Sequence, residues 1–320
     1  MSEDKALSEK QRRDRKMLHD QLGPVILEAL ADPMTVEVCL NADGTLWHER
    51  LGEEMRRIGR MDKARAEGAM RTIAGCWGVE LRADKPLLEG ELPFDGSRFA
   101  GQFPPVVPAP TWAIRKRASS VFSLVEYTKA GIMSARQAEI IREAVRERRN
   151  ILVVGGTGSG KTTLVNAIIK EMVESGPDER LVIIEDTGEI QCAAANYVQY
   201  HTSAEVSMTR LLRTTLRMRP DRIIVGEVRG AEALDLLKAW NTGHPGGVAT
   251  IHADSAVSGL SRMAEMISEN PDHPRPIEPM IARAANRVIY IEKEDRGRRV
   301  QEIVQVKGFG HGEYLIEKME

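Results

Sequence analysis

Residues 155–162 read Gly-Gly-Thr-Gly-Ser-Gly-Lys-Thr, and this stretch constrains the fold of the chain more than any other. An apolar run at 151–154 precedes it and an apolar segment at 164–169 follows it, which is the order strand, glycine-rich loop, helix. In that order the pattern G-x-x-x-x-G-K-[ST] predicts a phosphate-binding loop. The glycines let backbone N–H groups turn toward phosphate oxygens, and the positive end of the helix dipole adds to the attraction.

Two side chains of this loop have specific expected roles. Lys161 can reach the β- and γ-phosphates of a nucleoside triphosphate, and the hydroxyl of Thr162 can bind Mg²⁺. We therefore expect ATP and Mg²⁺ as cofactors. The residues predicted to bind the nucleotide here are Gly156, Thr157, Gly158, Ser159, Gly160, Lys161, Thr162 and Thr163.

Length and composition narrow the class of protein. The 320 residues are enough for about two domains. A net charge of −2 and only 4% aromatic residues argue against a general nucleic-acid surface, so no specific nucleic acid is expected. The N-terminus is dense in charge and no stretch approaches about 18 apolar residues. We expect a cytoplasmic protein without a transmembrane segment, with peripheral membrane association left open.

The first part of the chain predicts a tail followed by a small domain. Residues 1–16 are mostly polar and charged, and we expect them to be disordered. Residues 17–117 are expected to form an α+β domain. Its predicted elements are a helix near 16–31, a hairpin of 35–40 and 45–49, a helix at 62–77 and short strand-like pieces within 79–115.

After a predicted linker at 118–133, helices and strands alternate through residues 134–320. This alternation predicts parallel βαβ units, in a mainly parallel sheet with helices on both faces. The expected helices lie at 134–148, 161–174, 205–218, 231–241, 255–268 and 276–286, and the expected strands at 151–154, 181–185, 222–225, 248–251, 287–292 and 299–307.

Glu227 is the first candidate for the group that activates water. It follows the apolar strand 222–225, and ligands of open α/β sheets bind at the carboxyl ends of strands. We expect Glu227 to face the γ-phosphate as general base or water-orienting residue. Because Gly226 precedes it where such strands usually end in aspartate, we expect the ligands of the metal elsewhere.

A second group of acids follows the predicted strand 181–185. Clustered carboxylates at the end of a strand beside phosphates suit Mg²⁺, bound through water. Glu189 is the first candidate metal ligand and Glu185 the second. A solvated loop is the alternative interpretation.

His244 and His252 stand on either side of the predicted strand 248–251. A histidine beside a phosphate loop can hydrogen-bond the γ-phosphate and respond to its loss. We predict this role first for His252. A metal site is not expected, because no third ligand lies at suitable spacing.

Arg210, Arg213, Arg217 and Arg219 precede the strand 222–225. Arg213 and Arg217 are four residues apart, so they share a helix face. Such a row is either a solvated surface or a set of arginine fingers that act on the nucleotide of a neighbouring subunit. The second interpretation makes Arg213 and Arg217 candidate catalytic residues.

Four motifs occur in order between residues 155 and 253. They are the phosphate loop, Glu-Asp-Thr-x-Glu, Leu-Arg-x-x-Leu-Arg-x-x-Pro-Asp-x-x-x-x-Gly-Glu, and Thr-Gly-His with Thr-x-His-Ala. In this combination the chain resembles the secretion-superfamily traffic ATPases of type II and type IV systems and of pilus retraction. The segments 97–105 and 112–116 are similar to the end of that family's N-terminal domain. The compact length and the lack of a four-cysteine zinc element resemble the type IV, or conjugation, branch.

The resemblance covers about residues 20–310 and implies a RecA-like core. It also implies a homohexameric ring that binds nucleotide between its two domains. The implied function is an ATP-driven motor for pilus assembly or substrate export, working with inner-membrane secretion-channel proteins. Since a long N-terminal extension of some relatives is missing, direct docking to membrane partners through such a module is not implied.

The same resemblance carries over residue roles. It makes Glu227 the catalytic acid, Glu189 the second residue of the acidic motif and His252 the γ-phosphate contact. It further implies that Arg98 and Arg115 of the N-terminal domain close on the nucleotide.

Three other functions stay open at this point. A nucleic-acid translocase on the same RecA-like core would bind single strands tightly, with a steep salt dependence. A small-molecule kinase would release a phosphorylated product. A scaffold that binds ATP without hydrolysis would need no Glu227.

Overall fold

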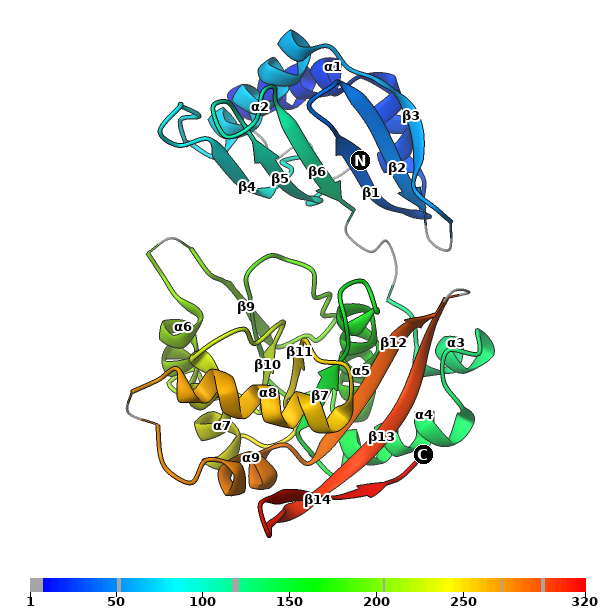
Figure 1. Cartoon of the computed structure of the whole chain (residues 1–320), viewed down its shortest axis with the longest axis vertical. Helices are drawn as coiled ribbons and strands as arrows, with labels where there is room; N and C mark the ends of the chain where they lie inside the picture. The colour runs from blue at the N-terminus through cyan, green and yellow to red at the C-terminus, as the bar shows by residue number, and fades with distance from the viewer. Residues whose placement is uncertain (1–7, 51–52, 117–120, 204, 272, 295–296) are drawn as a thin grey trace. The chain divides into compact units, whose positions relative to one another are not determined.

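The computed structural model describes residues 8–50, 53–116, 121–203, 205–271, 273–294 and 297–320. The chain divides into two compact units, Met1–Ser119 and Ser120–Glu320 (Figure 1).

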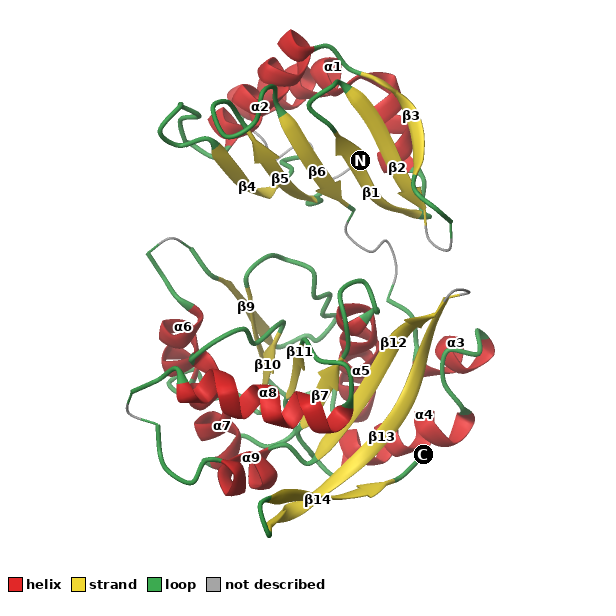
Figure 2. Ribbon diagram, in the orientation of Figure 1, coloured by secondary structure: helices red, strands yellow, loops and turns green. Residues whose placement is uncertain are grey.

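The first unit is a six-stranded antiparallel sheet with two helices (Figure 2). The strands follow the order β3-β2-β1-β6-β5-β4, and side chains of both helices pack with strand residues in one core. The expected hairpin is present, since β1 and β2 pair antiparallel. The elements are α1 (Glu9–Ala31), β1 (Thr35–Leu40), β2 (Thr45–Arg50), β3 (Arg56–Arg60), α2 (Lys63–Cys76), β4 (Leu87–Glu91), β5 (Arg98–Gln102) and β6 (Thr111–Arg115).

The first helix corrects the predicted tail at 1–16. Helix α1 already begins at Glu9, and residues 1–7 lie outside the described part of the chain. Ser8 and Gln11 form a capping box, in which each side chain bonds the backbone N–H of the other. The sequence analysis missed this helix start because the first residues of the helix are charged and exposed. The buried apolar residues that indicate a helix begin only at Leu18. The helix bends at Gly23, whose φ of 76° lies in the left-handed region just before Pro24.

The second unit has an eight-stranded sheet in the order β14-β13-β12-β7-β11-β10-β8-β9. From β12 to β9 each neighbouring pair is parallel, whereas β13 and β14 pair antiparallel at one edge. The strands are β7 (Ile151–Val154), β8 (Leu181–Glu185), β9 (Tyr197–His201), β10 (Arg222–Val225), β11 (Val248–Ile251), β12 (Arg287–Glu294), β13 (Gly297–Gly310) and β14 (Glu313–Lys318).

Helices cover both faces of this sheet. Alternate residues of the central strands point to opposite sides, so Ile151 and Val153 join one apolar cluster and Leu152 and Val154 the other. The first cluster contains side chains of α3 to α5, and the second those of α6 to α9. The helices are α3 (Leu124–Lys129), α4 (Ala135–Arg146), α5 (Lys161–Ser175), α6 (Met208–Thr215), α7 (Glu232–Asn241), α8 (Ala256–Ser268) and α9 (Glu278–Ala284).

Several predicted bounds differ from the structure. Helix α3 lies within the predicted linker 118–133, where Ser123 and Glu126 form a capping box. Helix α6 is shorter than the predicted 205–218. Strand β9 was not predicted, because it is an edge strand without fully buried side chains.

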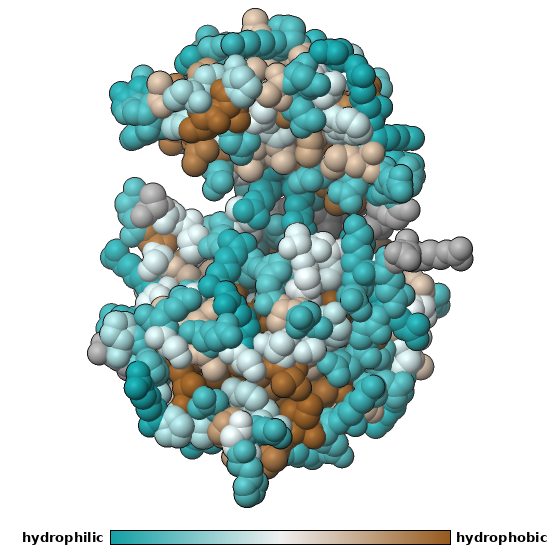
Figure 3. All heavy atoms as spheres, viewed as in Figure 1, coloured by the Kyte–Doolittle hydropathy of each residue, from teal (hydrophilic) through white to brown (hydrophobic). Residues whose placement is uncertain are grey.

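The surface is dominated by hydrophilic side chains on the face that Figure 3 shows. Within the described ranges no helix is long and apolar enough to cross a membrane. The central strands β7, β10 and β11 are buried at every residue, so their carboxyl ends are fixed platforms for the loops that follow.

Candidate functional site

The loop between β7 and α5 has the backbone that its glycines permit. Gly158 has a φ of 70° and Gly160 a φ of 93°, both in the left-handed region that other residues rarely adopt. At Gly156 and Gly158 a Cβ atom would meet no other atom within 4 Å, so this side of the loop is open. Thr162 and Thr163 lie half-buried in the first turn of α5. The loop therefore presents open backbone at a helix N-terminus, where an anion binds.

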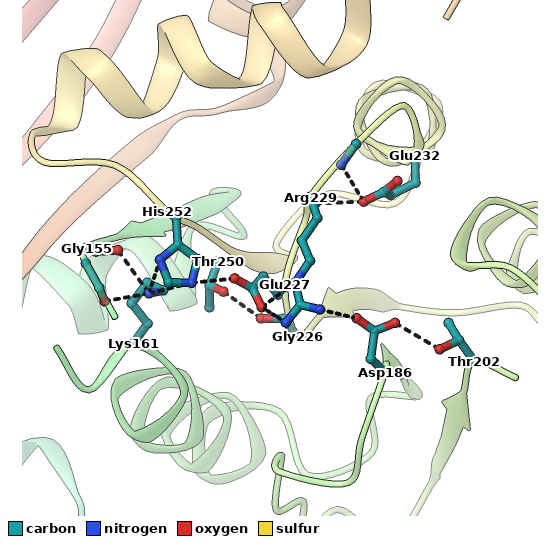
Figure 4. Close-up of polar contacts among 12 residues, drawn as sticks. Gly155, Lys161, Asp186, Thr202, Gly226, Glu227, Arg229, Glu232, Thr250 and His252 are labelled. Carbon is teal, nitrogen blue, oxygen red and sulfur yellow. Dashed lines mark hydrogen bonds and ion pairs between the residues drawn. The ribbon is translucent and has the colours of Figure 1, made fainter. Parts of the chain in front are cut away.

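Lys161 lies folded against this loop (Figure 4). Its Nζ donates hydrogen bonds to the carbonyl oxygens of Gly155 at 2.9 Å and Gly156 at 2.8 Å. The Ser159 hydroxyl is buried and has no hydrogen-bond partner among the residues that the structure describes. An ammonium group and an unpaired buried hydroxyl beside an open glycine loop fit a phosphate group.

Glu227 and His252 meet beside Lys161. Glu227 follows β10 and His252 follows β11, and His252 Nε2 lies 2.6 Å from Glu227 Oε1. Both ring nitrogens of His252 lie 3.4 Å from Lys161 Nζ. The Thr250 hydroxyl donates to the Gly226 carbonyl at 2.7 Å and so ties the two strand ends together. The structure thus brings together three residues that the sequence suggested from separate motifs.

The His252 imidazole is held toward its neutral form. Partial burial lowers its pKa, and the charge of Lys161 lowers it further, whereas Glu227 acts in the opposite direction. A neutral ring beside Lys161 keeps one nitrogen free to accept and one to donate a hydrogen bond.

His252 and Glu227 form a close polar contact. Glu227 Oε1 is buried and accepts no aligned hydrogen bond from the described residues. A carboxylate oxygen has a second lone pair, so Oε1 can also accept from a water molecule, as a group that takes a proton from water requires.

The acidic segment after β8 separates into two kinds of carboxylate. Glu185 is buried, and its Oε2 accepts backbone N–H bonds from Glu189 at 2.9 Å and Ile190 at 3.0 Å. Its Oε1 accepts from the Gln199 side chain. These bonds argue against the predicted metal role of Glu185, because its oxygens hold the loop together. Glu189 is half-buried on that loop, and its metal role stays a prediction.

His244 and His252 lie at opposite ends of β11. His244 precedes the strand, and its Nδ1 lies 3.1 Å from the Pro220 carbonyl oxygen. Since ligands bind at the carboxyl ends of parallel strands, only His252 stands on the side of the phosphate loop.

The four predicted arginines lie on or beside elements other than those that carry this cluster. Arg213 is exposed on α6 and pairs with Asp235 of α7 at 3.0 Å, and Arg217 is exposed just after α6. In the first unit, Arg98 of β5 and Arg115 of β6 are directly opposite each other on neighbouring strands. The roles of all four toward a nucleotide stay predictions.

A cavity of about 710 Å³ opens beside the phosphate loop. Gly156, Thr157 and His252 line one side, and residues of α8 and β12 line the other. The space in front of the loop is therefore bounded by side chains of the same unit.

Arg229 is a site residue that the sequence analysis missed. It forms ion pairs with Glu227 and with Asp186 of the acidic segment. Arg229 lies two residues after Glu227, with the buried Val228 between them. In an extended segment alternate side chains face the same side, so this spacing could have predicted that Arg229 lies beside Glu227.

The fold is similar to those of known secretion ATPases. The VirB11 ATPase from the *Brucella suis* type IV secretion system, solved in complex with sulphate, is 26% identical with a TM-score of 0.51, covering 93% of this chain and 97% of that chain. The *Legionella pneumophila* ATPase DotB has the same fold, with a TM-score of 0.63 and 20% identity over 87% of this chain and 79% of that chain.

Sequence comparison identifies the family. The model described as Type II/IV secretion system protein matches residues 21–296. The probable conjugal transfer protein TrbB of *Sinorhizobium fredii* is 49% identical over 302 residues, covering 94% of this chain and 92% of that protein. The type IV secretion system protein PtlH of *Bordetella pertussis* is 36% identical over 74% of this chain and 78% of that protein.

These findings define the class as RecA-like secretion ATPases. The chain belongs to the type II/IV secretion system protein family, and within it to the type IV secretion and conjugal-transfer branch. The family resemblance expected from the four ordered motifs is confirmed.

Proposed function

We propose that this chain hydrolyses ATP at the loop 155–162 and powers pilus assembly or substrate export in a type IV secretion or conjugal-transfer system. The observation that carries the proposal is the meeting of Lys161, His252 and Glu227 at the carboxyl ends of adjacent parallel strands. Family membership supports ATP hydrolysis over the kinase, scaffold and nucleic-acid translocase interpretations.

Binding of the triphosphate uses the loop and Lys161. The open glycine backbone and the Ser159 hydroxyl donate to phosphate oxygens, and Lys161 exchanges its carbonyl partners for the more strongly charged phosphates. Thr162 and Glu189 would hold Mg²⁺, Glu189 through water, and the ion would neutralise charge on the phosphates.

Hydrolysis uses Glu227 and His252. Glu227 Oε1 accepts the proton of the attacking water, because this oxygen faces His252 and the phosphate loop and has a second lone pair for the water. The neutral ring of His252 lies between Glu227 and Lys161, where it donates to the terminal phosphate and responds when that phosphate leaves.

The active assembly is a homohexameric ring at the cytoplasmic face of the inner membrane, in contact with secretion-channel proteins. Arg213 and Arg217 are exposed and can supply positive charge to the nucleotide of a neighbouring subunit, and Arg98 and Arg115 supply it from the N-terminal unit. Family membership supports this assembly.

Replacement of Lys161 tests the catalytic proposal. We expect Lys161→Ala to abolish ATP hydrolysis and weaken ATP binding while the protein stays folded. Lys170→Ala, which removes a half-buried lysine of the same helix away from the loop, is the control and should keep wild-type turnover. Wild-type turnover in Lys161→Ala would overturn the proposed function.

Subunit mixing tests the ring. Arg217→Ala and Lys161→Ala subunits should each be inactive alone, and their mixture should regain part of the activity. Some interfaces of a mixed ring pair an intact loop with an intact arginine. Light scattering with and without ATP establishes that mixed rings form. An inactive mixture of proven rings would refute the action of Arg217 across the interface.

A further inference from the structure

Arg229 binds one oxygen of the Glu227 carboxylate through two hydrogen bonds (Figure 4). Arg229 Nε donates to Glu227 Oε2 at 2.8 Å, and Nη2 donates to the same oxygen. The other oxygen, Oε1, is turned toward His252 at 2.6 Å. The two oxygens of this carboxylate therefore have different partners.

Arg229 is itself anchored on two sides. Its Nη1 lies 3.2 Å from Asp186 Oδ2, and Asp186 Oδ1 accepts the hydroxyl of Thr202 at 2.9 Å. Its backbone N–H donates to Glu232 Oε1 at 2.7 Å, which also accepts from the N–H of Gly230. Thr202, which follows strand β9, thus holds Asp186 beside the guanidinium, and Glu232, the first residue of helix α7, holds the backbone of Arg229.

The Arg229 guanidinium can hold the Glu227 carboxylate because it stays positively charged. Partial burial opposes the charge, but the hydrogen bond and ion pair with Glu227 raise the pKa of Arg229 above its ordinary value. A planar guanidinium that reaches two carboxylates holds both in a defined geometry, which a lysine cannot reproduce.

We propose that Arg229 is a positioning residue of the ATPase reaction. It occupies Glu227 Oε2 and so turns Oε1 toward His252 and the phosphate loop, where the attacking water must give up its proton. The proposal rests on the proposed role of Glu227. It further makes Asp186 the anchor through which the β8–β9 edge of the sheet acts on the catalytic carboxylate.

The test compares Arg229→Gln with a matched control in the full-length protein. Arg142 on α4 also lies between two carboxylates, at 3.3 Å from Glu139 and 3.5 Å from Glu171, so Arg142→Gln removes a similar pair of contacts elsewhere. For Arg229→Gln we expect kcat to fall about 10- to 100-fold, as for a misplaced catalytic group, with KM for ATP changed less than about twofold. Arg142→Gln should keep the wild-type kcat.

Two further measurements distinguish a role of Arg229 in positioning Glu227 from a role that only stabilises the fold. Arg229→Lys should regain part of the lost kcat, because the charge returns without the planar fork. The NMR titration of His252 without nucleotide should move to higher pH in Arg229→Gln, because a nearby positive charge is lost. The titration should stay at its wild-type position in Arg142→Gln.

The outcomes distinguish this proposal from the one on which it rests. Wild-type kcat in Arg229→Gln beside an inactive Glu227→Gln would overturn the positioning role alone. An unmoved His252 titration, or an equal loss of kcat in Arg142→Gln, would also overturn it. Full turnover in Glu227→Gln would instead overturn the catalytic role of Glu227.

Discussion

Replacement of Glu185 separates a structural carboxylate from a metal ligand. Glu185 is 2% exposed, and its carboxylate accepts backbone N–H bonds from Glu189 and Ile190. Hydrogen bonds to a charged group contribute about 1.5–3 kcal/mol each, so loss of these two bonds in Glu185→Ala should lower the free energy of unfolding by about 3–6 kcal/mol. At roughly 2–4 °C per kcal/mol for a unit of this size, Tm should fall by about 6–24 °C.

Thermal unfolding followed by circular dichroism measures this change. Glu185→Gln keeps one acceptor oxygen, so it should lower the free energy of unfolding by a smaller amount, about 1–2 kcal/mol. Glu174→Ala, an exposed residue of α5, is the control and should change Tm little. If Glu185→Ala kept the wild-type Tm and only required more Mg²⁺, Glu185 would be a metal ligand and the structural argument would be refuted.

Two other predictions concern the strand that carries the histidine. The buried side chain of Asn150 accepts hydrogen bonds from two backbone N–H groups ahead of β11 and donates one to a backbone carbonyl. Asn150→Ala should therefore lower the free energy of unfolding, measured in urea, by about 3 kcal/mol or more. A decrease of less than about 1 kcal/mol would contradict this. The pKa of His252, measured by NMR, should rise in Lys161→Ala and fall further in Glu227→Gln, because one neighbour disfavours and the other favours the cation. Unchanged values in both variants would show that the three groups do not meet in solution.

The sequence was most informative where chemistry and backbone requirements coincide. The loop 155–162 needs glycines with positive φ, a lysine and a helix start at fixed spacing, so its position and its neighbouring strand and helix could be predicted. Glu227 and His252 were expected at strand ends, but their contact depends on β10 and β11 being neighbours in the sheet. That order is set by tertiary packing and not by local pattern.

Glu185 and Arg229 show what a local pattern could not decide. Both are charged residues at strand ends, and charge alone does not tell which carboxylate points into the loop and which into the site. Glu185 is the last residue of a fully buried strand, and backbone N–H groups of its own loop fill its acceptor positions. Arg229 pairs with Glu227, two residues before it, and with Asp186 on the loop after β8, which is distant in sequence.

The central claim is that Glu227 acts on water and not on bound phosphate. The direct measurement is the steady-state ATPase rate of Glu227→Gln together with its equilibrium Kd for ATP. The account predicts a Kd close to that of the wild type and turnover at least about 100-fold slower, the loss expected for a general base. A rate and an affinity that fall together would contradict it, because Glu227 would then hold metal or structure.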